Sequence, residues 1–249
     1  MRTKNNHSDG KQNNDGWIYG KHAVKAALQN KKRKIFRFVM LESVADYFKD
    51  IKNIKPEIVN AEFFQAKFGK NATHQGCAVQ VGKLSEIFIE DLLEDENDLR
   101  PFVFLDQVTD PQNVGSIMRA GAVFGARAVV VPENSSPELS PAIIKAASGA
   151  AEIVPLIRVT NLVQTINKLK KEGFWCVGLD ERGEKTLSQI DLKGKIIIVI
   201  GSEGDGMRRL TKESCDFLVQ LPFADNFSTL NAAQAATVSL YEVLRQQQN

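Results

Sequence analysis

The chain has 249 residues, of which 43% are hydrophobic and 25% are charged, a balance typical of globular proteins with one large domain or two small ones. No apolar run approaches the roughly 20 residues needed to span a bilayer, and the N-terminus lacks the apolar core of a signal peptide. The three cysteines, Cys77, Cys176 and Cys215, are widely spaced, which favours reduced core thiols and a cytoplasmic location.

The net charge of +2 is unevenly distributed. Residues 1–82 carry 15 Lys and Arg against 7 Asp and Glu, residues 83–100 carry 2 against 7, and residues 101–249 carry 15 against 16. A basic front end suits a polyanionic partner, although a solvated basic surface would give the same balance.

The first 82 residues are predicted to form a small α/β domain behind a disordered tail. Residues 1–16 are polar apart from Met1, too polar to offset the entropy of ordering. The spacing of apolar residues predicts helices over 22–29, 43–48 and 61–68 and strands over 35–40, 57–59 and 76–81. Because these pieces are short and alternate, we expect one compact domain over residues 17–82. The acidic run that follows predicts a linker over residues 83–100.

Residues 101–249 predict a larger α/β domain. Strands are expected over 102–105, 128–131, 153–157, 174–179, 196–200 and 217–221, and helices over 115–124, 141–148, 162–171 and 231–245. Pro155 suggests an edge position or a bulge for its strand. Apolar strands that alternate with helices favour a mainly parallel sheet covered on both faces.

Three stretches place polar residues at the ends of apolar strands. The first contains Asn113 and, six residues later, Arg119 followed by Ala120. Taken alone, Asn113 would be a helix cap and Arg119 a surface charge. The second is the glycine-rich segment 201–206, which allows backbone to approach a ligand but lacks the G-x-G-x-x-G spacing of a dinucleotide loop.

The third stretch runs from Pro222 to Asn231, where a helix begins. Taken alone, Ser228 or Thr229 would be an ordinary helix cap. Together and in this order, the three stretches resemble the signature motifs of the SpoU (TrmH-like) family of RNA 2′-O-ribose methyltransferases, which belongs to the SPOUT class. The resemblance implies a trefoil-knotted α/β fold. The chain departs from the usual motif at Thr229, where serine is common, and in the residues just after Asn231.

The front of the chain extends the resemblance. Residues 18–24 and 74–76 resemble the L30e-like RNA substrate-binding domain of the RlmB-like branch, which acts on a guanosine of large-subunit ribosomal RNA. Phosphate contacts are expected from a basic cluster comprising Lys31, Lys32, Arg33, Lys34 and Arg37. His22 and His74 are candidates for RNA contact and equally for a structural role.

The resemblance implies that S-adenosyl-L-methionine donates a methyl group to a ribose 2′ oxygen. The expected catalytic residues are Arg119, Asn113, Glu203, Thr229 and Asn231. The expected cofactor-binding residues are Ile200, Gly201, Gly206, Leu221 and Leu230, and no metal is expected. Because a guanidinium stays protonated to about pH 12, Arg119 is interpreted as a clamp on the RNA phosphate beside the target ribose rather than as a base.

The resemblance also implies a homodimer whose sites combine residues of both subunits. Its interface would draw on the last helix, unless the same apolar residues form core: Ala232, Ala235, Ala236, Val238, Leu240 and Leu244. Three alternative functions stay open: a transfer RNA methyltransferase of the same family, a non-catalytic RNA-binding relative, and a nucleotide-dependent oxidoreductase. The missing glycine fingerprint argues against the last of these.

Overall fold

The computed structural model describes residues 16–134, 139–224 and 230–249. Of the tail expected over residues 1–16, residues 1–15 lie outside this part of the chain, as does the candidate catalytic residue Thr229. Gly16 belongs to the ordered chain, because its carbonyl oxygen accepts from the backbone N–H of Val81 at 3.0 Å. The chain divides into two compact units, Met1–Leu84 and Ser85–Asn249.

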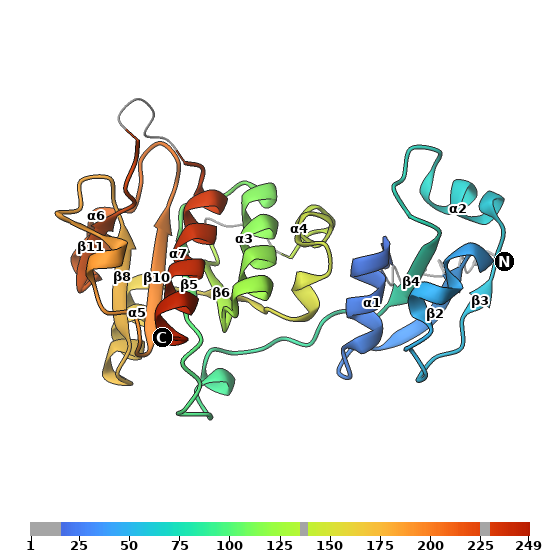
Figure 1. Ribbon diagram of the computed structural model, residues 1–249, viewed down its shortest axis with the longest axis horizontal. Coiled ribbons are helices and arrows are strands. Elements are labelled where there is room, and N and C mark those ends of the chain that lie inside the picture. The colour runs from blue at the N-terminus through green and yellow to red at the C-terminus, as the bar shows by residue number, and fades with distance from the viewer. Residues whose placement is uncertain (1–15, 135–138, 225–229) are drawn as a thin grey trace, which may run out of the picture. The chain divides into compact units, whose positions relative to one another are not determined.

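The first unit is built on a four-stranded sheet in the order β1-β4-β2-β3 (Figure 1). Its strands are β1 (Trp17–Tyr19), β2 (Ile35–Met40), β3 (Glu57–Ile58) and β4 (Cys77–Val81). Strand β4 runs antiparallel to β1 and β2, and β3 runs parallel to β2. The helices are α1 (Lys21–Gln29) and α2 (Ala61–Phe68), with a 3₁₀ helix η1 (Glu42–Phe48) where an α-helix from Ser43 was expected.

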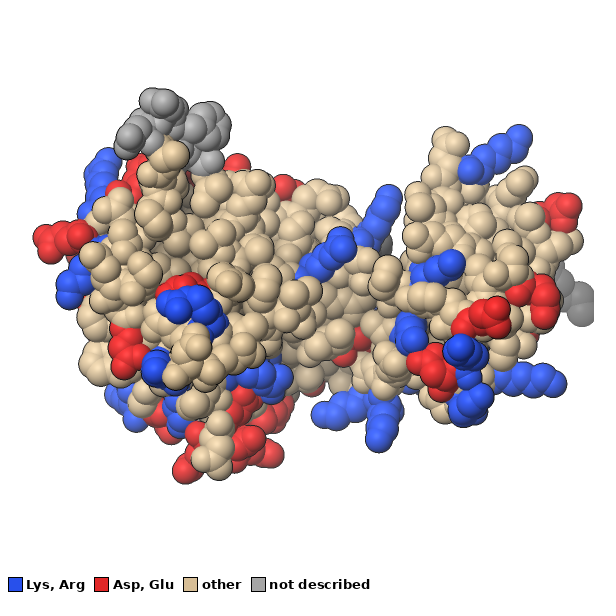
Figure 2. All heavy atoms as spheres, viewed as in Figure 1, with Lys and Arg blue, Asp and Glu red and all other residues tan. Residues whose placement is uncertain are grey.

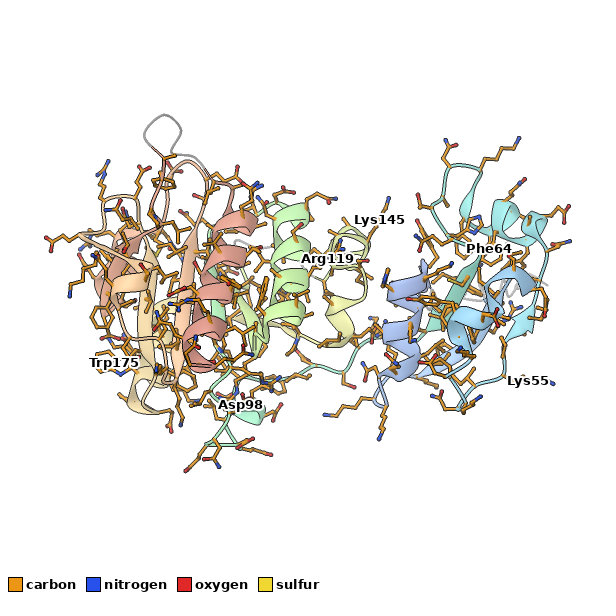
Figure 3. The ribbon with its side chains drawn as sticks, viewed as in Figure 1. Lys55, Phe64, Asp98, Arg119, Lys145 and Trp175 are labelled. Atoms are coloured by element: carbon orange, nitrogen blue, oxygen red, sulfur yellow. The ribbon has the colours of Figure 1, made fainter. Side chains whose placement is uncertain are left out.

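The two α-helices of this unit pack on its sheet through apolar side chains, a full stripe in α1 and one phenylalanine in α2. Helix α1 buries Ala23, Val24, Ala27 and Leu28, the spacing of one helical face. Helix α2 begins at Asn60, whose side chain accepts a hydrogen bond from the backbone N–H of Phe63 at 3.1 Å. Its Phe64 is fully buried against the sheet (Figure 3).

The second unit is built on a seven-stranded sheet in the order β7-β6-β5-β10-β8-β11-β9, and every strand pair in it is parallel. Its strands are β5 (Phe102–Asp106), β6 (Ala128–Pro132), β7 (Leu156–Val159), β8 (Trp175–Leu179), β9 (Lys185–Thr186), β10 (Ile196–Gly201) and β11 (Phe217–Gln220). Its α-helices are α3 (Pro111–Phe124), α4 (Pro141–Ala147), α5 (Leu162–Lys171), α6 (Arg209–Ser214) and α7 (Ala232–Gln247), and its 3₁₀ helices are η2 (Glu90–Leu92), η3 (Ala150–Glu152) and η4 (Leu187–Gln189). The predicted parallel α/β sheet is confirmed.

The central strands are buried on both faces, which explains why they read as unbroken apolar runs. Alternate residues such as Phe102 and Phe104 pack with Leu162, Ile166 and Leu169 of α5. Helices α3, α4 and α7 pack together on the other side of the sheet (Figure 1). The knotted threading implied by the family resemblance stays a prediction.

Several predicted boundaries were wrong for local reasons. Helix α3 begins at Pro111 rather than at residue 115, because the Asp110 side chain accepts a hydrogen bond from the backbone N–H of Gln112 at 3.0 Å and proline fits the first turn. Strand β7 begins at Leu156, after Pro155 and a 3₁₀ turn, and lies at the edge of the sheet. The short elements β9 and α6 were not predicted.

The acidic segment expected as a linker packs in part on the second unit. Ile89 is buried in the same cluster as Phe102 and Phe104. The buried guanidinium of Arg127 donates to the carbonyl oxygens of Asp95 and Asp98, both at 3.0 Å. Acidic side chains gather at the lower edge of this unit in Figure 2.

Candidate active site

A cleft of about 420 Å³ opens at the C-terminal edge of the parallel sheet. It is lined by Gln107, Val108, Thr109, Asp110, Asn113, Ser202, Glu203, Asn231 and Ala232. Strands β5 and β10 are neighbours and end in register at Asp106 and Gly201, so the loops that follow them meet here. Ligands of open α/β sheets bind at this edge.

Asn113 and Glu203 join the first two motifs directly. The Asn113 Nδ2 group donates to Glu203 Oε1 at 2.8 Å, across 90 residues of sequence. Asn113 is not the helix cap that its position suggested, because Asp110 caps α3 and Asn113 lies two residues into the helix. Its amide is therefore free of a capping role and is oriented by a carboxylate, which leaves the Asn113 side-chain oxygen as an acceptor at the cleft.

An ion pair between a buried carboxylate and an exposed arginine holds the loop that carries Glu203. Asp106 is fully buried at the end of β5. Its Oδ2 accepts from the backbone N–H of Arg208 at 2.8 Å, and its Oδ1 accepts from Arg208 Nε at 2.7 Å. This pairing was not predictable from the sequence, since 102 residues separate the partners. The aspartate at a strand end was visible, but its partner was not.

The glycines of this loop serve the loop itself. A Cβ on Gly201 would lie 2.3 Å from the carbonyl carbon of Gly206, because the chain returns against the end of β10. Gly206 has φ +67°, a left-handed conformation that favours glycine. Ser202 and Gly206 exchange backbone hydrogen bonds at 3.2 and 3.1 Å, which closes the turn around Glu203. The close return of the chain therefore accounts for both glycines, without the close approach of a ligand that the sequence suggested.

Asn231 closes the cleft from the start of α7. Its Oδ1 accepts from the backbone N–H of Gln234 at 2.8 Å, and Gln234 Oε1 accepts from the backbone N–H of Asn231 at 3.2 Å. This reciprocal capping box explains Gln234, one of the unusual residues after the third motif. It also shows that Asn231 caps the last helix. The sequence had suggested Ser228 or Thr229 for this role.

Arg119 is not part of this cleft. Arg119 is six positions after Asn113 on α3. The two side chains therefore point in directions that differ by about 120° and lie about 9 Å apart along the helix axis, so they are not on the same face. It is exposed one turn beyond Gly115, the residue at which α3 meets Ala146 of α4 (Figure 3). Arg119 makes no hydrogen bond or ion pair with any residue that the structure describes. The cleft of one chain therefore lacks the arginine that the motif predicts for it.

Gln107 is a cleft residue that the sequence analysis missed. Its φ of +63° is rare for a residue with a side chain. It directly follows β5 and lines the cleft with Asn113 and Glu203. Side chains held in this conformation at a cleft are candidates for function, because backbone strain persists only where the surrounding structure stabilises it and such sites are often functional. No sequence signal distinguishes this glutamine from an ordinary loop residue.

The expected cofactor residues lie along the same sheet edge. Ile200 is buried and Gly201 half-buried at the end of β10, and Leu221 is buried just after β11, with strand β8 between them. Leu230 is exposed immediately before the cap of α7. None of the expected cofactor residues is among those that line the cleft, so they lie beside it along the sheet edge. Apolar side chains and backbone groups at strand ends are the surroundings that an adenosine and a methionine chain require, and the cofactor contacts themselves stay a prediction.

The expected RNA-binding cluster is only partly available at the surface of the first unit. Lys31, Lys32 and Lys34 are exposed, whereas Arg33 is buried, with 9% of its surface exposed. Arg37 is exposed but pairs with Glu57. Figure 2 shows Lys and Arg projecting from several sides of this unit. The three lysines are therefore accessible to a phosphate and Arg33 is not, and the phosphate contacts themselves stay a prediction.

The two candidate histidines of the first unit differ. His74 stacks on Phe64 with ring centroids 4.4 Å apart, and its Nδ1 accepts from the backbone N–H of Gly76 at 3.1 Å. His22 is exposed near Tyr47. His74 is thus structural, and only His22 is placed to meet a ligand.

Two kinds of feature are absent from the described part of the chain. Within residues 16–134, 139–224 and 230–249, no three acidic, cysteine or histidine side chains group closely enough to hold a metal ion. Over the same ranges, no helix is both long and apolar enough to cross a membrane.

Comparison with known families matches both units. Residues 100–241 match the model of the SpoU rRNA Methylase family, and residues 17–86 match the model for RNA 2′-O ribose methyltransferase substrate binding. The 23S rRNA (guanosine-2′-O-)-methyltransferase RlmB of Pseudomonas putida is 38% identical over 239 residues, which cover 93% of this chain and 96% of the relative. The protein of the same name from Pseudomonas syringae pv. tomato is 40% identical over 237 residues, covering 92% and 95%.

Solved structures share the fold. The SpoU methyltransferase AviRb from Streptomyces viridochromogenes, in complex with the cofactor AdoMet, aligns with a TM-score of 0.75 at 22% identity over 94% of this chain and 90% of its own. An AdoMet-bound rRNA methyltransferase from Sinorhizobium meliloti aligns with a TM-score of 0.72 at 23% identity, over 92% and 86%.

Proposed function

Because the chain belongs to the SpoU rRNA Methylase family, we propose that it transfers a methyl group from S-adenosyl-L-methionine to the ribose 2′ oxygen of a guanosine in large-subunit ribosomal RNA. The observation that carries the proposal is the Asn113–Glu203 hydrogen bond, which brings two of the three motifs together in one cleft. Relatives that span nearly the whole chain and bear this activity in their names support the substrate. We place the activity in the cytoplasm.

The residues of the cleft position the nucleophile. When bound, S-adenosylmethionine supplies an electrophilic methyl group on a sulfonium, so the protein mainly needs to align the ribose oxygen with it. Ile200, Leu221 and Leu230 would hold the cofactor at the sheet edge. Glu203 fixes the Asn113 amide, and the Asn113 oxygen accepts a hydrogen bond from a ribose hydroxyl. Asn231 completes the polar wall of the cleft, and Thr229, which lies outside the described residues, stays a candidate from the third motif.

Arg119 acts in this proposal from a second copy of the chain. It is exposed on another face of α3, and Val123, one turn further along, is an exposed apolar residue. Val238 and Tyr241 of α7 are also exposed, and Tyr241 packs edge-on against Phe124 with centroids 6.0 Å apart. This apolar surface beside Arg119 suits a homodimer interface that would bring the arginine to a partner's cleft.

The last helix divides between core and surface. Ala232, Ala236 and Leu240, named as interface candidates from the sequence, are buried in the chain's own core. Val238 is exposed, and Ala235 and Leu244 are half-buried. Only the second group is available to a partner subunit.

The first experiment incubates the protein with labelled S-adenosylmethionine and, separately, unmodified large-subunit ribosomal RNA and bulk transfer RNA. Label on the 2′ oxygen of one ribosomal guanosine is the expected result. Label on transfer RNA alone would keep the chemistry and overturn the substrate. Cofactor binding without transfer to either RNA would favour the non-catalytic relative.

Arg119→Ala should abolish methyl transfer while cofactor affinity stays nearly unchanged, because Arg119 is assigned to the RNA phosphate rather than to the cofactor. Asn113→Ala should also be inactive. Mixing the two inactive variants should recover about a quarter of wild-type activity, since half of the dimers then contain one complete shared site. The measurement is methyl transfer after equilibration of the subunits. No recovery in mixed dimers would contradict a shared site, and lost cofactor binding in Arg119→Ala would contradict its assigned role.

A further inference from the structure

A row of unlike side chains crosses the sheet of the first unit. The strand register pairs Trp17 of β1 with Gln80 of β4, and Gln80 with Arg37 of β2. Residues paired across strands point to the same face, so these three side chains stand side by side. Arg37 then donates from Nε and Nη2 to the two carboxylate oxygens of Glu57 at 3.1 and 2.7 Å. The Trp17 row thus comprises Trp17, Gln80, Arg37 and Glu57.

Helix α2 covers only part of this face. Phe64 packs on Val39 and Ala78, and all three are fully buried. The Trp17 row lies further along the same strands, where the Arg37 and Glu57 side chains are 42% and 48% exposed. Trp17 and Gln80 are half-buried, and the Gln80 amide makes no hydrogen bond with a described residue. This end of the sheet is open to a ligand.

Cations gather on the aromatic end of the row. The Arg37 guanidinium lies 5.8 Å from the centre of the Trp17 ring and 5.8 Å from that of Phe63. The Lys67 ammonium lies 5.4 Å from the Trp17 ring. Significant contacts of this type occur roughly once per 70–80 residues, yet Trp17 carries both cations. Planar aromatic and guanidinium groups on one surface are the surroundings in which RNA-binding proteins stack unpaired bases.

The charges of the row suit a base better than a phosphate. The hydrogen bonds from Arg37 lower the pKa of the Glu57 carboxyl, which keeps it ionised and leaves the pair nearly neutral. A carboxylate next to the guanidinium repels phosphate. A carboxylate and an amide can instead accept from and donate to the edge of a base. Arg37 is therefore not the simple phosphate contact that the basic cluster suggested.

We propose that the Trp17 row receives one unpaired RNA base, stacked on the Trp17 and Arg37 planes, with Gln80 and Glu57 at its hydrogen-bonding edge. The identity of the ligand as RNA rests on the proposed function. Lys31, Lys32 and Lys34 supply sequence-independent phosphate contacts, whereas the Trp17 row selects unpaired over paired RNA. A base inside a duplex cannot reach it.

The test uses fluorescence anisotropy with the full chain and two labelled RNAs of equal length, a hairpin with an unpaired loop and a blunt duplex. Arg37→Ala and Gln80→Ala should each weaken hairpin binding about tenfold, the scale of one lost stacked base, and duplex binding less than about twofold. Lys55→Ala removes another exposed cation of the same unit and should change neither by more than about twofold (Figure 3). Thermal melts confirm that each variant folds.

Equal losses on both RNAs would mean a phosphate contact and would overturn the proposal, as would unchanged hairpin binding in both variants. Methyl transfer by the wild-type chain is measured in parallel with the same cofactor label. Methyl transfer without any preference for the hairpin would support the proposed function and contradict base binding by the Trp17 row. Hairpin selectivity that both variants lose supports the row even if the wild-type chain transfers no methyl group.

Discussion

Gln75 in the first unit and Gln107 in the second have the same backbone conformation and use their side chains differently. Their φ values are +54° and +63°. Gln75 Oε1 accepts from the backbone N–H of Lys21 at 2.8 Å and so caps α1, where Gly20 offers no capping side chain. Gln107 lines the cleft. In the first unit the strained residue stabilises a helix through its side chain. In the second unit the residue with the same strain places its side chain at the cleft.

The contrast extends to charged groups. In the second unit the Asp106 carboxylate is fully buried and accepts hydrogen bonds from Arg208, which fixes the loop of Glu203. In the first unit the Arg37–Glu57 pair lies at the surface over aromatic rings. Methyl transfer needs a fixed geometry, whereas RNA recognition tolerates adjustable side chains. The two units differ as these tasks require.

The largest effect should come from the buried charge of the second unit. Arg208→Met leaves Asp106 buried and without its ion pair, which should lower the free energy of unfolding by about 3 kcal/mol. Arg37→Ala, which breaks the surface pair of the first unit, should cost about 1 kcal/mol at most. Urea-induced unfolding measures both. Adding Asp106→Asn to Arg208→Met should recover part of the loss, and equal costs for the two single variants would break the comparison.

A smaller effect is expected from a methyl group added to the loop of the second unit. Gly201→Ala places a Cβ against the backbone of Gly206 and should cost about 1–3 kcal/mol, because no flexible side chain can yield. Gly204→Ala is the matched control, since a Cβ there meets nothing within 4 Å. Thermal unfolding and cofactor titration should separate the two variants. A tolerated Gly201→Ala would show that this loop is not fixed.

The same substitution at the two glutamines should change stability differently. Gln107→Gly should raise the free energy of unfolding by about 1 kcal/mol, because glycine adopts this conformation without strain, and should lower methyl transfer. Gln75→Gly also loses the cap of α1 and should be neutral or destabilising. Melting temperatures and transfer rates decide the matter. Full activity in Gln107→Gly would remove the functional reading of its strain.

The smallest effect concerns pH and the surface pair. Since Arg37 lowers the pKa of Glu57, the pair contributes stability that is complete above the ordinary glutamate pKa of about 4.3 and is lost as pH falls through the lowered value. The gap in unfolding free energy between wild type and Glu57→Gln should therefore shrink in acid, by no more than about 1 kcal/mol at this exposed site. Urea unfolding at pH 7 and pH 3 measures the gap. A gap that widens in acid would contradict the assigned pair.

Periodic apolar patterns predicted most helices and strands, because α5 and β10, for example, are placed by the burial of their own side chains. The pattern missed η3 and the true start of β7. Residues 153–157 read as one apolar strand, but Ile153 is exposed and the strand begins only after Pro155. It also missed the start of α3, which depends on a capping carboxylate rather than on hydrophobicity.

The site was predictable as a set of motifs and not as a geometry. The order of Asn113, Glu203 and Asn231 along the chain pointed to one cleft, and the structure brings these three together. Local sequence does not show that Asp106 pairs with Arg208, because the partners meet only through the sheet. The Trp17 row was hidden for the same reason, since strand register decides which side chains become neighbours.

Helix α3 carries Asn113 to the cleft and Arg119 to a different face, and it is wedged against α4 at Gly115 and against Ala126 at Gly121. Adding or removing a single residue between Asn113 and Arg119 would turn one relative to the other by about 100°. An insertion or deletion in this segment would therefore misplace one of the two side chains, whereas surface loops of the same unit can accept insertions. The six-residue spacing in the first motif therefore fixes the angle between two faces of one helix, the face that carries Asn113 and the face that carries Arg119.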